Sequence, residues 1–275
     1  GDMAEHQPPA AQHQPDHVAD QRPRARSGLV DDRLAERLMG EQGMQIFEAF
    51  RGLRHPNGSV VARHKIIDDA LRERFKGRPE RLAVVLGAGL DTRAFRFRTG
   101  RWVEIDMPGT LDYKERLLPA ASCPVPLTRI GLDLSRGSLE DTLSPYATSK
   151  KVSVIVEGVF MYLDESVAAN MARALSKLFP NHTLICDLLS RRFARRYAGP
   201  LRNALSQLGA ELTWTPDDPV KAFRRIGYER VGGSSIVLRA AEWKSIPVAT
   251  WAVRWLLPTL RDGYAVHLFK PASAS

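Results

Sequence analysis

Hydrophobic and polar positions divide the chain into three regions. Residues 1–28 are rich in Pro, Gln, His, Asp and Arg and contain few apolar positions, so we expect a flexible N-terminal arm that cannot bury a core. From residue 29 to residue 77 the apolar positions recur at helical spacing, and the last of these helices, over 59–76, is expected to end at Gly77. After Gly77, short apolar runs alternate with helical segments.

This alternation predicts an α/β domain over residues 29–275, with a mostly parallel sheet covered by helices on both faces. The predicted strands are 82–86, 102–105, 126–131, 153–156, 183–188, 228–231 and 264–269. The predicted helices between them include 110–118, 139–143 and 165–179, the last with Asp164 as its N-cap.

The alternation lapses over residues 190–225, which form a basic, helical stretch interrupted by Pro-Asp-Asp-Pro. The stretch is too long for an ordinary loop, so we expect a lid or substrate-binding insertion over the mouth of the sheet. Arg191 and Arg192, followed by Arg195 and Arg196, are candidates for anchoring an acidic substrate. A solvated helix face is the alternative for each of them.

One charged residue lies on an inner helical face. In the predicted helix 59–76, Arg63 follows Val60 by three residues and precedes Ile67 by four, which places it in the apolar row. A buried guanidinium needs an anionic partner. That partner is either a protein carboxylate or the carboxylate of a ligand.

A glycine turn follows the first predicted strand. The strand 82–86 runs directly into Gly87, Ala88 and Gly89, where glycines allow a tight turn and the close approach of a ligand to the main chain. The third glycine of the dinucleotide fingerprint is replaced by Thr92, which argues against a pyrophosphate-binding site for NAD.

Acidic residues end three further strands. Asp106, 17 residues after Gly89, is placed to accept hydrogen bonds from ribose hydroxyls. Asp133, followed by Leu134, is placed to hold an adenine ring, although an N-cap role is equally compatible with it. Glu157 follows a central apolar strand, where an unpaired carboxylate is costly, so we expect it to face the ligand crevice. Tyr162 is placed either in that crevice or in the core.

The composition excludes several classes of protein. The sequence has two cysteines, which predict neither a disulfide framework nor a metal site, and no apolar run approaches the ~20 residues of a membrane span. We therefore expect a cytoplasmic protein without a metal or membrane partner. The net charge of +9 comes from scattered arginines (31 of the 40 basic residues), so nucleic acid is not the expected partner.

In this order, these motifs resemble the leucine carboxyl methyltransferase family of class I S-adenosylmethionine enzymes, and its bacterial branch, with polyketide O-methyltransferases of the tetracenomycin type, fits better than the protein-modifying branch. The matching pieces are Ala62-Arg63 to Ile67-Asp68, Leu86-Gly87-Ala88-Gly89-Leu90-Asp91-Thr92-Arg93, Glu104-Ile105-Asp106-Met107-Pro108 with Lys114, Leu132-Asp133-Leu134, Glu157-Gly158-Val159 with Tyr162-Leu163, and Gly263-Tyr264-Ala265-Val266.

The resemblance implies a seven-stranded Rossmann-like sheet and S-adenosylmethionine as the cofactor. It also implies roles for individual residues: the cofactor carboxylate on Arg63, the methionine part along Gly87–Gly89, the ribose on Asp106 next to Met107, the adenine on Asp133 and Leu134, and the sulfonium end beside Glu157. Asp91 and Arg93 are interpreted as a structural pair that braces the glycine turn.

The expected reaction is methyl transfer to a carboxylate or hydroxyl oxygen of a small molecule, with Tyr162 orienting that oxygen. A carboxylate is ionised at pH 7 and needs no general base, whereas a phenol, with a pKa of ~10, needs one. No histidine at a strand end provides an obvious base, which favours a carboxylate. The alternatives are an NAD-dependent oxidoreductase, a protein or nucleic-acid methyltransferase, and a binding protein without activity.

Overall fold

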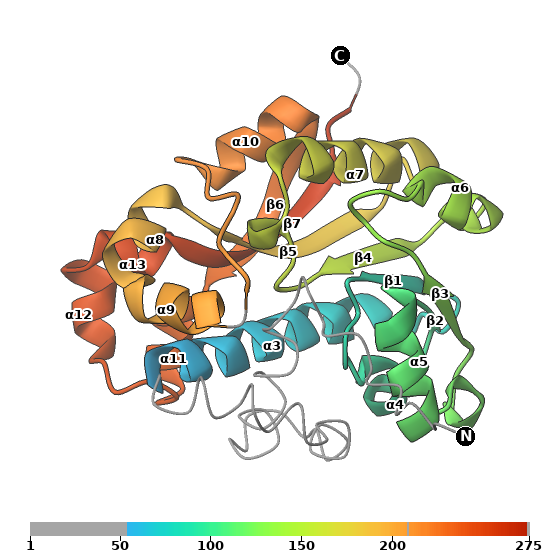
Figure 1. Cartoon of the computed structure of the whole chain (residues 1–275), viewed down its shortest axis with the longest axis horizontal. Coiled ribbons are helices and arrows are strands. Elements are labelled where there is room, and N and C mark those ends of the chain that lie inside the picture. Colours follow the sequence, from blue (N-terminus) through green and yellow to red (C-terminus); the bar gives the residue numbers. More distant parts are fainter. Residues whose placement is uncertain (1–53, 208, 274–275) are drawn as a thin grey trace, which may run out of the picture.

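Seven strands form one continuous sheet in the structure, a computed structural model that describes residues 54–207 and 209–273. The strands are β1 (Leu82–Leu86), β2 (Arg101–Asp106), β3 (Leu127–Gly131), β4 (Val152–Val156), β5 (Thr183–Leu189), β6 (Tyr228–Ser235) and β7 (Tyr264–Pro271). Their order is β3-β2-β1-β4-β5-β7-β6, and β7 runs antiparallel to both of its neighbours, β5 and β6, while all other neighbouring pairs are parallel (Figure 1). The predicted α/β class and all seven predicted strands are confirmed, with ends that differ by a few residues.

The helices cover both faces of this sheet. They are α3 (Arg54–Phe75), α4 (Arg93–Phe97), α5 (Pro108–Leu117), α6 (Leu139–Leu143), α7 (Glu165–Leu178), α8 (Arg191–Tyr197), α9 (Gly199–Gln207), α10 (Pro219–Ile226), α11 (Ile236–Glu242), α12 (Thr250–Trp255) and α13 (Pro258–Asp262), with short 3-10 turns at η1 (Ala120–Ser122), η2 (Ser144–Tyr146) and η3 (Phe160–Tyr162). Asp164 is the N-cap residue of α7 but makes no side-chain capping bond. The predicted arm and the predicted helices before residue 54 lie outside the described residues.

Helix α3 begins five residues earlier than predicted. Pro56 and Gly58 read as helix breakers, but a proline in the first turn costs no hydrogen bond within the helix. A Cβ on Gly58 would lie 2.1 Å from the carbonyl oxygen of Ser245, so the glycine is required by the close packing of α3 against the segment after α11. The predicted end is confirmed, because the helix stops at Phe75 and Gly77 has a φ of 65°.

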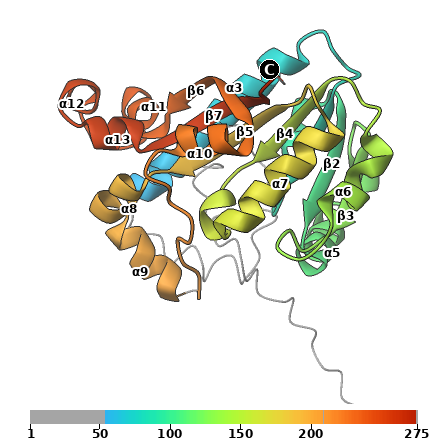
Figure 2. The ribbon, with the colours of Figure 1, turned by 90° about the horizontal axis from the view of Figure 1, so that it is seen from above.

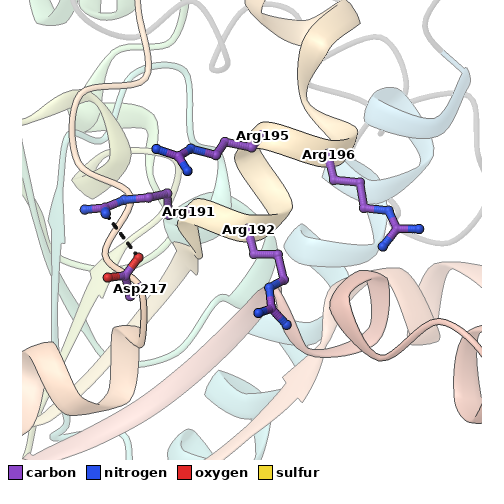
Figure 3. A pocket seen from close by; sticks show the side chains of 5 residues that line it. All are labelled: Arg191, Arg192, Arg195, Arg196 and Asp217. Carbon is purple, nitrogen blue, oxygen red and sulfur yellow. Dashed lines mark ion pairs between the residues drawn. The ribbon is translucent and has the colours of Figure 1, made fainter.

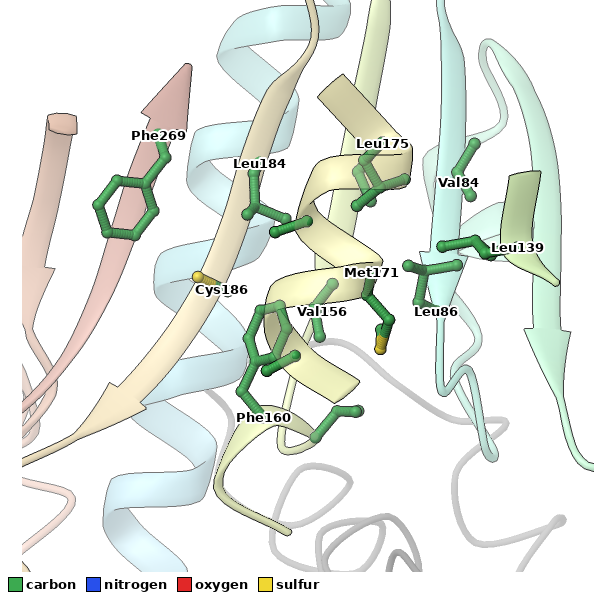
Figure 4. Close-up of a cluster of buried hydrophobic side chains, with 14 of the residues drawn as sticks. Val84, Leu86, Leu139, Val156, Phe160, Met171, Leu175, Leu184, Cys186 and Phe269 are labelled. Atoms are coloured by element: carbon green, nitrogen blue, oxygen red, sulfur yellow. The ribbon is translucent and has the colours of Figure 1, made fainter. Parts of the chain in front are cut away.

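The core has two layers because successive strand residues point to opposite faces of the sheet. One layer contains Val84, Leu86 and Val156, which pack against Met171 and Leu175 of α7 (Figure 4). The other layer contains Val85 and Ile155 of the sheet and packs against α3 and α11. Seen from above, α7 and α10 cover one face and α3 lies on the other (Figure 2). The strands are therefore fixed on both sides, and their carboxyl ends form a rigid edge.

The segment predicted as an insertion has two parts. Helix α10 packs on the sheet, with the Phe223 ring stacked 4.6 Å from that of Phe269, so this end of the segment belongs to the core layer. Helices α8 and α9 and the extended stretch after them lie beyond the end of β5. The backbone N–H groups of Thr213 and Trp214 donate to the carbonyl oxygen of Met161, which ties the extended stretch to η3. A lid role for α8 and α9 stays a prediction.

The structure can be compared with the expectations about cysteines, metal sites and membrane spans. Cys123 and Cys186 are both free thiols. Among residues 54–207 and 209–273, no cluster of three or more His, Cys, Asp or Glu side chains is arranged to hold a metal ion. Every helix in these ranges falls short of the length and apolar character that crossing a bilayer requires.

Two core histidines predict a loss of stability in acid. Burial lowers the pKa of His182 to about 4, and burial together with the charge of Arg230 lowers the pKa of His267 to about 4. Unfolded histidine titrates near pH 6.5, so the unfolded chain binds more protons between these values and stability falls as the pH falls through this window. We expect each histidine to cost about 1–2 kcal/mol between pH 7 and pH 5.

The measurement is the free energy of urea unfolding at pH 7 and pH 5 for the native protein and for the H182Q/H267Q variant. The variant should be less stable at pH 7 but should lose less on acidification. The raised pKa of Asp106 acts in the opposite direction in both proteins, so the difference between them isolates the histidines. An equal loss in both proteins would contradict the assignment.

Candidate functional site

The glycine turn is tied to the end of the neighbouring strand. Gly87 and Gly89 have φ values of 65° and 47°, which non-glycine residues rarely adopt. The N–H of Gly89 donates to Oδ2 of Asp106 at 2.6 Å, and the N–H of Met107 donates to Oδ1 at 2.7 Å. The Asp106 carboxylate therefore holds the turn after β1 against the end of β2.

Asp106 is more buried than its place at a strand end suggested. Its exposed fraction is only 6%. Burial raises the pKa of its carboxyl, and the two backbone hydrogen bonds only partly offset this effect. An ionised carboxylate has about four acceptor positions, of which the two N–H groups occupy two, so further donors can still bind it.

Arg63 lies on the inner face of α3, as predicted, and is 1% exposed. Its Nε donates to Oε1 of Glu157 at 3.2 Å, and its Nη1 donates to the Tyr264 hydroxyl at 2.9 Å. Nη1 also lies 3.5 Å from Oδ2 of Asp187 in β5. The anionic partners that the structure shows for Arg63 are thus protein carboxylates.

Arg93 occupies the centre of a buried ionic network. Its guanidinium donates to Oδ1 of Asp68 at 2.7 Å, to Oε2 of Glu157 at 2.7 Å and to Asp91. The N–H of Arg93 also donates to Oδ1 of Asp91 at 2.7 Å, which closes the loop after the glycine turn. The structure therefore contains the predicted Asp91–Arg93 pair, within a larger network than the sequence indicated.

Ion pairs link several arginines and acids in this network. Arg63, Arg72, Arg93 and Arg96 pair with Asp68, Asp91, Glu157 and Asp187. Burial alone would raise the pKa values of the carboxyl groups, but the charges of Arg93 and His64 outweigh it and lower the pKa of Glu157 well below its usual value. The same balance lowers the pKa values of Asp68 and Asp91. These three carboxyl groups are therefore held in their ionised form.

The residues predicted to contact adenine lie near the surface. Asp133 is half-buried, and its Oδ1 accepts from the N–H and the hydroxyl of Ser135, both at 2.9 Å. The N-cap of α6 is Ser138, so the alternative N-cap role of Asp133 was wrong. Leu134 packs on the core layer of α7, while Met107 is 36% exposed beside Asp106.

The predicted substrate-binding residues lie on two different elements. Tyr162 ends η3, is half-buried and packs against the core layer of α3. Arg191 and Arg192 begin α8 and are exposed, and Arg191 forms an ion pair of 3.3 Å with Asp217. The stretch after α9 connects the two elements. The N–H groups of Thr213 and Trp214 donate to the carbonyl oxygen of Met161, and the N–H of Arg191 donates to the carbonyl oxygen of Pro216 at 3.1 Å.

The geometry agrees with comparisons to known proteins. The family model for leucine carboxyl methyltransferases matches residues 16–176, more than half of the chain. The chain belongs to the leucine carboxyl methyltransferase family. The resemblance found in the sequence is thereby confirmed.

Individual relatives of the chain are distant. The tetracenomycin polyketide synthesis O-methyltransferase TcmP of Streptomyces glaucescens is 27% identical over 168 residues, which cover 58% of this chain and 57% of that protein. A putative S-adenosyl-L-methionine-dependent methyltransferase of Streptomyces coelicolor is 32% identical over 184 residues, 62% of each chain. The chain thus aligns with about three fifths of the length of these relatives.

A solved structure supports the fold. The crystal structure of a DUF574 family protein from Streptomyces avermitilis superposes with a TM-score of 0.57 at 16% identity and covers 85% of this chain and 94% of that protein. At this identity the likeness shows the fold alone, which is that of the class I methyltransferase sheet observed here.

Two residues of the ionic network, His64 and Asp187, were not predicted from the sequence. The Nδ1 of His64 lies 3.2 Å from both carboxylate oxygens of Glu157. Asp187 accepts from the N–H of Gly158 at 2.7 Å and from the Tyr264 hydroxyl at 3.1 Å. The available signal for Asp187 was a single acid within an otherwise apolar strand, which is costly unless it is paired.

Arg63 pairs with protein carboxylates and is predicted to bind the cofactor carboxylate as well, so we expect its removal to have two effects. We expect Arg63→Ala to weaken binding of S-adenosylhomocysteine about tenfold, through the loss of one charge-assisted hydrogen bond, and to destabilise the fold by leaving Glu157 and Asp187 less well paired. Calorimetric titration and urea unfolding measure the two effects separately. A variant that loses stability but binds normally would assign Arg63 to the protein acids alone.

Proposed function

We propose that the chain is an S-adenosylmethionine-dependent O-methyltransferase that acts on a small molecule such as a polyketide or another secondary metabolite. The observation that carries the proposal is the assembly of the glycine turn, Asp106 and the Glu157 network at one edge of the sheet. Ligands of open α/β sheets bind at this edge, outside the carboxyl ends of the strands.

S-adenosylmethionine as the cofactor follows from membership of the family and confirms the prediction. The charges of the site fit this molecule. It carries a sulfonium, an ammonium and a carboxylate, and the site offers both buried carboxylates and buried guanidinium groups. The open acceptor positions of Asp106 fit ribose hydroxyls, and Glu157 and Arg63 provide an anion and a cation for the amino-acid end. When bound, the cofactor supplies a methyl group that is already activated for transfer.

The residues of the chain then have to position an acceptor oxygen and keep water away. Binding energy spent on alignment is sufficient for such a reaction, because the leaving group needs no further activation. We assign the orientation of the acceptor oxygen to Tyr162, which lies five residues beyond Glu157 on η3. Asp133 and Leu134 are assigned to the adenine, and Arg191 and Arg192 to an acidic part of the acceptor.

The histidines favour a carboxylate acceptor over a phenol. His182 and His267 belong to the core, hydrogen-bond to Phe179 and Arg230 respectively, and have pKa values lowered to about 4. His64 is fully buried against Glu157. None of these three histidines is therefore placed as an exposed general base, whereas an ionised carboxylate is already nucleophilic.

The test is incubation of the protein with S-adenosylmethionine carrying a labelled methyl group and with fractionated extracts of the producing cell. Mass spectrometry should identify a labelled small molecule, and mild alkali should release the label as methanol, because methyl esters hydrolyse and aryl methyl ethers do not. Label that survives alkali would indicate that the acceptor is a hydroxyl group and not a carboxylate. Label on protein or RNA, or binding of NAD in place of S-adenosylhomocysteine, would refute the proposal.

A further inference from the structure

Four arginines and one aspartate line an open cavity of about 490 Å³ beside α8. The lining residues are Arg191, Arg192, Arg195, Arg196 and Asp217 (Figure 3). In Figure 3, Arg191 and Arg195 extend toward the side on which Asp217 lies, while Arg192 and Arg196 extend toward other sides of the helix. Apart from Asp217, all the side chains that line the cavity are thus arginines.

The positive charge of this cavity is not balanced by the protein. Asp217 pairs with Arg191, at 3.3 Å, and is 77% exposed, so this pair is weak. In the part of the chain that the structure describes, Arg192, Arg195 and Arg196 have no ion-pair partner. Arg196 lies instead over the ring of Tyr197, 5.6 Å from its centre.

The spacing of these arginines is unfavourable for the helix itself. Arg191 and Arg195 are four residues apart, as are Arg192 and Arg196, and like charges at this spacing repel each other on a helix surface. Ser190 caps α8 through its hydroxyl, which accepts from the N–H of Phe193 at 3.2 Å, and Ala194 anchors it in the core. The helix is therefore held in place by its inner face while its outer face concentrates positive charge.

We propose that the α8 cavity binds a phosphate or diphosphate group carried by the methyl acceptor. This inference rests on the proposed function and narrows its substrate class from acidic to phosphorylated. A phosphate monoester or diphosphate carries about two or more negative charges at pH 7 and offers the acceptor oxygens that planar guanidinium groups bind in pairs. A single carboxylate would leave a larger positive charge uncompensated.

The cavity lies within reach of the cofactor edge. Asp187, a member of the ionic network, precedes Arg191 by four residues, so their Cα atoms are at most about 14 Å apart. The opposite wall, at Asp217, belongs to the stretch that is hydrogen-bonded to Met161, the neighbour of Tyr162. One small molecule can therefore place its phosphate on α8 and its nucleophilic oxygen near Tyr162.

The positive charge of α8 is confined to too small an area to favour a nucleic acid as the ligand. All four arginines belong to one helix of seven residues, and the stretch behind it contains acids, at Glu211, Asp217 and Asp218. A nucleic-acid surface requires basic groups spread along a groove or stripe so that several phosphates are contacted in succession. A single phosphorylated group needs only the short basic surface that α8 provides.

The experiment titrates the full chain with inorganic pyrophosphate by calorimetry at low ionic strength. We expect binding by the native protein, and at least about tenfold weaker binding by R195Q, because one charge-assisted contact is lost. R173Q is the matched control: Arg173 is an exposed arginine on α7, so it removes the same charge elsewhere and should bind within about twofold of the native protein.

Two further binding measurements distinguish a small phosphorylated ligand from a lipid headgroup and from a nucleic acid. Vesicles containing phosphatidic acid and an RNA duplex are offered to the same three proteins. Absence of pyrophosphate binding, or equal weakening in R195Q and R173Q, would overturn the proposal. So would binding that depends on Arg195 only with vesicles or only with RNA. Titration with S-adenosylhomocysteine in parallel tests the proposed function independently, because R195Q should leave that affinity unchanged.

Discussion

Replacing Arg93 with glutamine is expected to lower the free energy of unfolding at pH 7 by about 3–5 kcal/mol, the usual cost of removing one partner from a buried ion pair. The Arg93 guanidinium is fully buried and pairs with Asp68, Asp91 and Glu157. Its loss leaves these three buried carboxylates with fewer positive charges. Their pKa values should then rise, because burial is no longer outweighed.

The pH dependence of this variant separates charge from packing. With raised pKa values in the folded state, the carboxyl groups of R93Q take up protons as the pH falls toward 4, so the deficit relative to the native protein should narrow. Urea unfolding from pH 7 to pH 4.5 measures this difference. R239Q is the control: Arg239 is 48% exposed, pairs with Glu242 at 3.0 Å, and its removal should cost about 1 kcal/mol or less. A deficit for R93Q that is small, or constant with pH, would contradict the network as described.

Replacing Asp106 with asparagine is expected to weaken binding of S-adenosylhomocysteine about a hundredfold. The carboxylate accepts from Gly89 and Met107 and has positions left for ribose hydroxyls, and a hydrogen bond to a charged group contributes about 1.5–3 kcal/mol. The asparagine amide turns a donor toward one of these N–H groups, so the glycine turn should also loosen. Calorimetry measures the affinity, and urea unfolding measures the accompanying loss of stability.

The effect of D106N on cofactor affinity has to be distinguished from its effect on stability. D262N removes an exposed carboxylate, 63% accessible and paired with Arg261, and should change neither quantity. D106N should bind weakly even at a temperature at which its circular dichroism shows a folded protein. If D106N binds with native affinity and is only less stable, Asp106 braces the glycine turn and does not contact the ribose.

The architecture was predictable from local pattern. Short apolar runs separated by helical segments indicated the strands, and the glycine turn and Asp106 marked the edge where a ligand binds. Each strand is recognised from its own short stretch of sequence, and the glycine turn lies within about 20 residues of Asp106. Spacing along the chain is therefore enough to interpret these signals. Arg63 was recognised as buried because helical periodicity places it between Val60 and Ile67.

The ionic network was not predictable in the same way. Arg63 is 94 positions from Glu157, 124 from Asp187 and 201 from Tyr264, and only the packing of α3 beneath β4, β5 and β7 brings them together. Periodicity shows that a charge is buried but not which partner it finds. The start of α3 escaped for a related reason, since Gly58 is required by a contact with Ser245, 187 positions away.

The account depends most directly on where the cofactor lies. A crystal structure with S-adenosylhomocysteine should show the ribose on Asp106 and the amino-acid end between the glycine turn, Arg63 and Glu157. Density for the ligand at any other place, or an edge of the sheet that admits only a pyrophosphate-containing nucleotide, would contradict it.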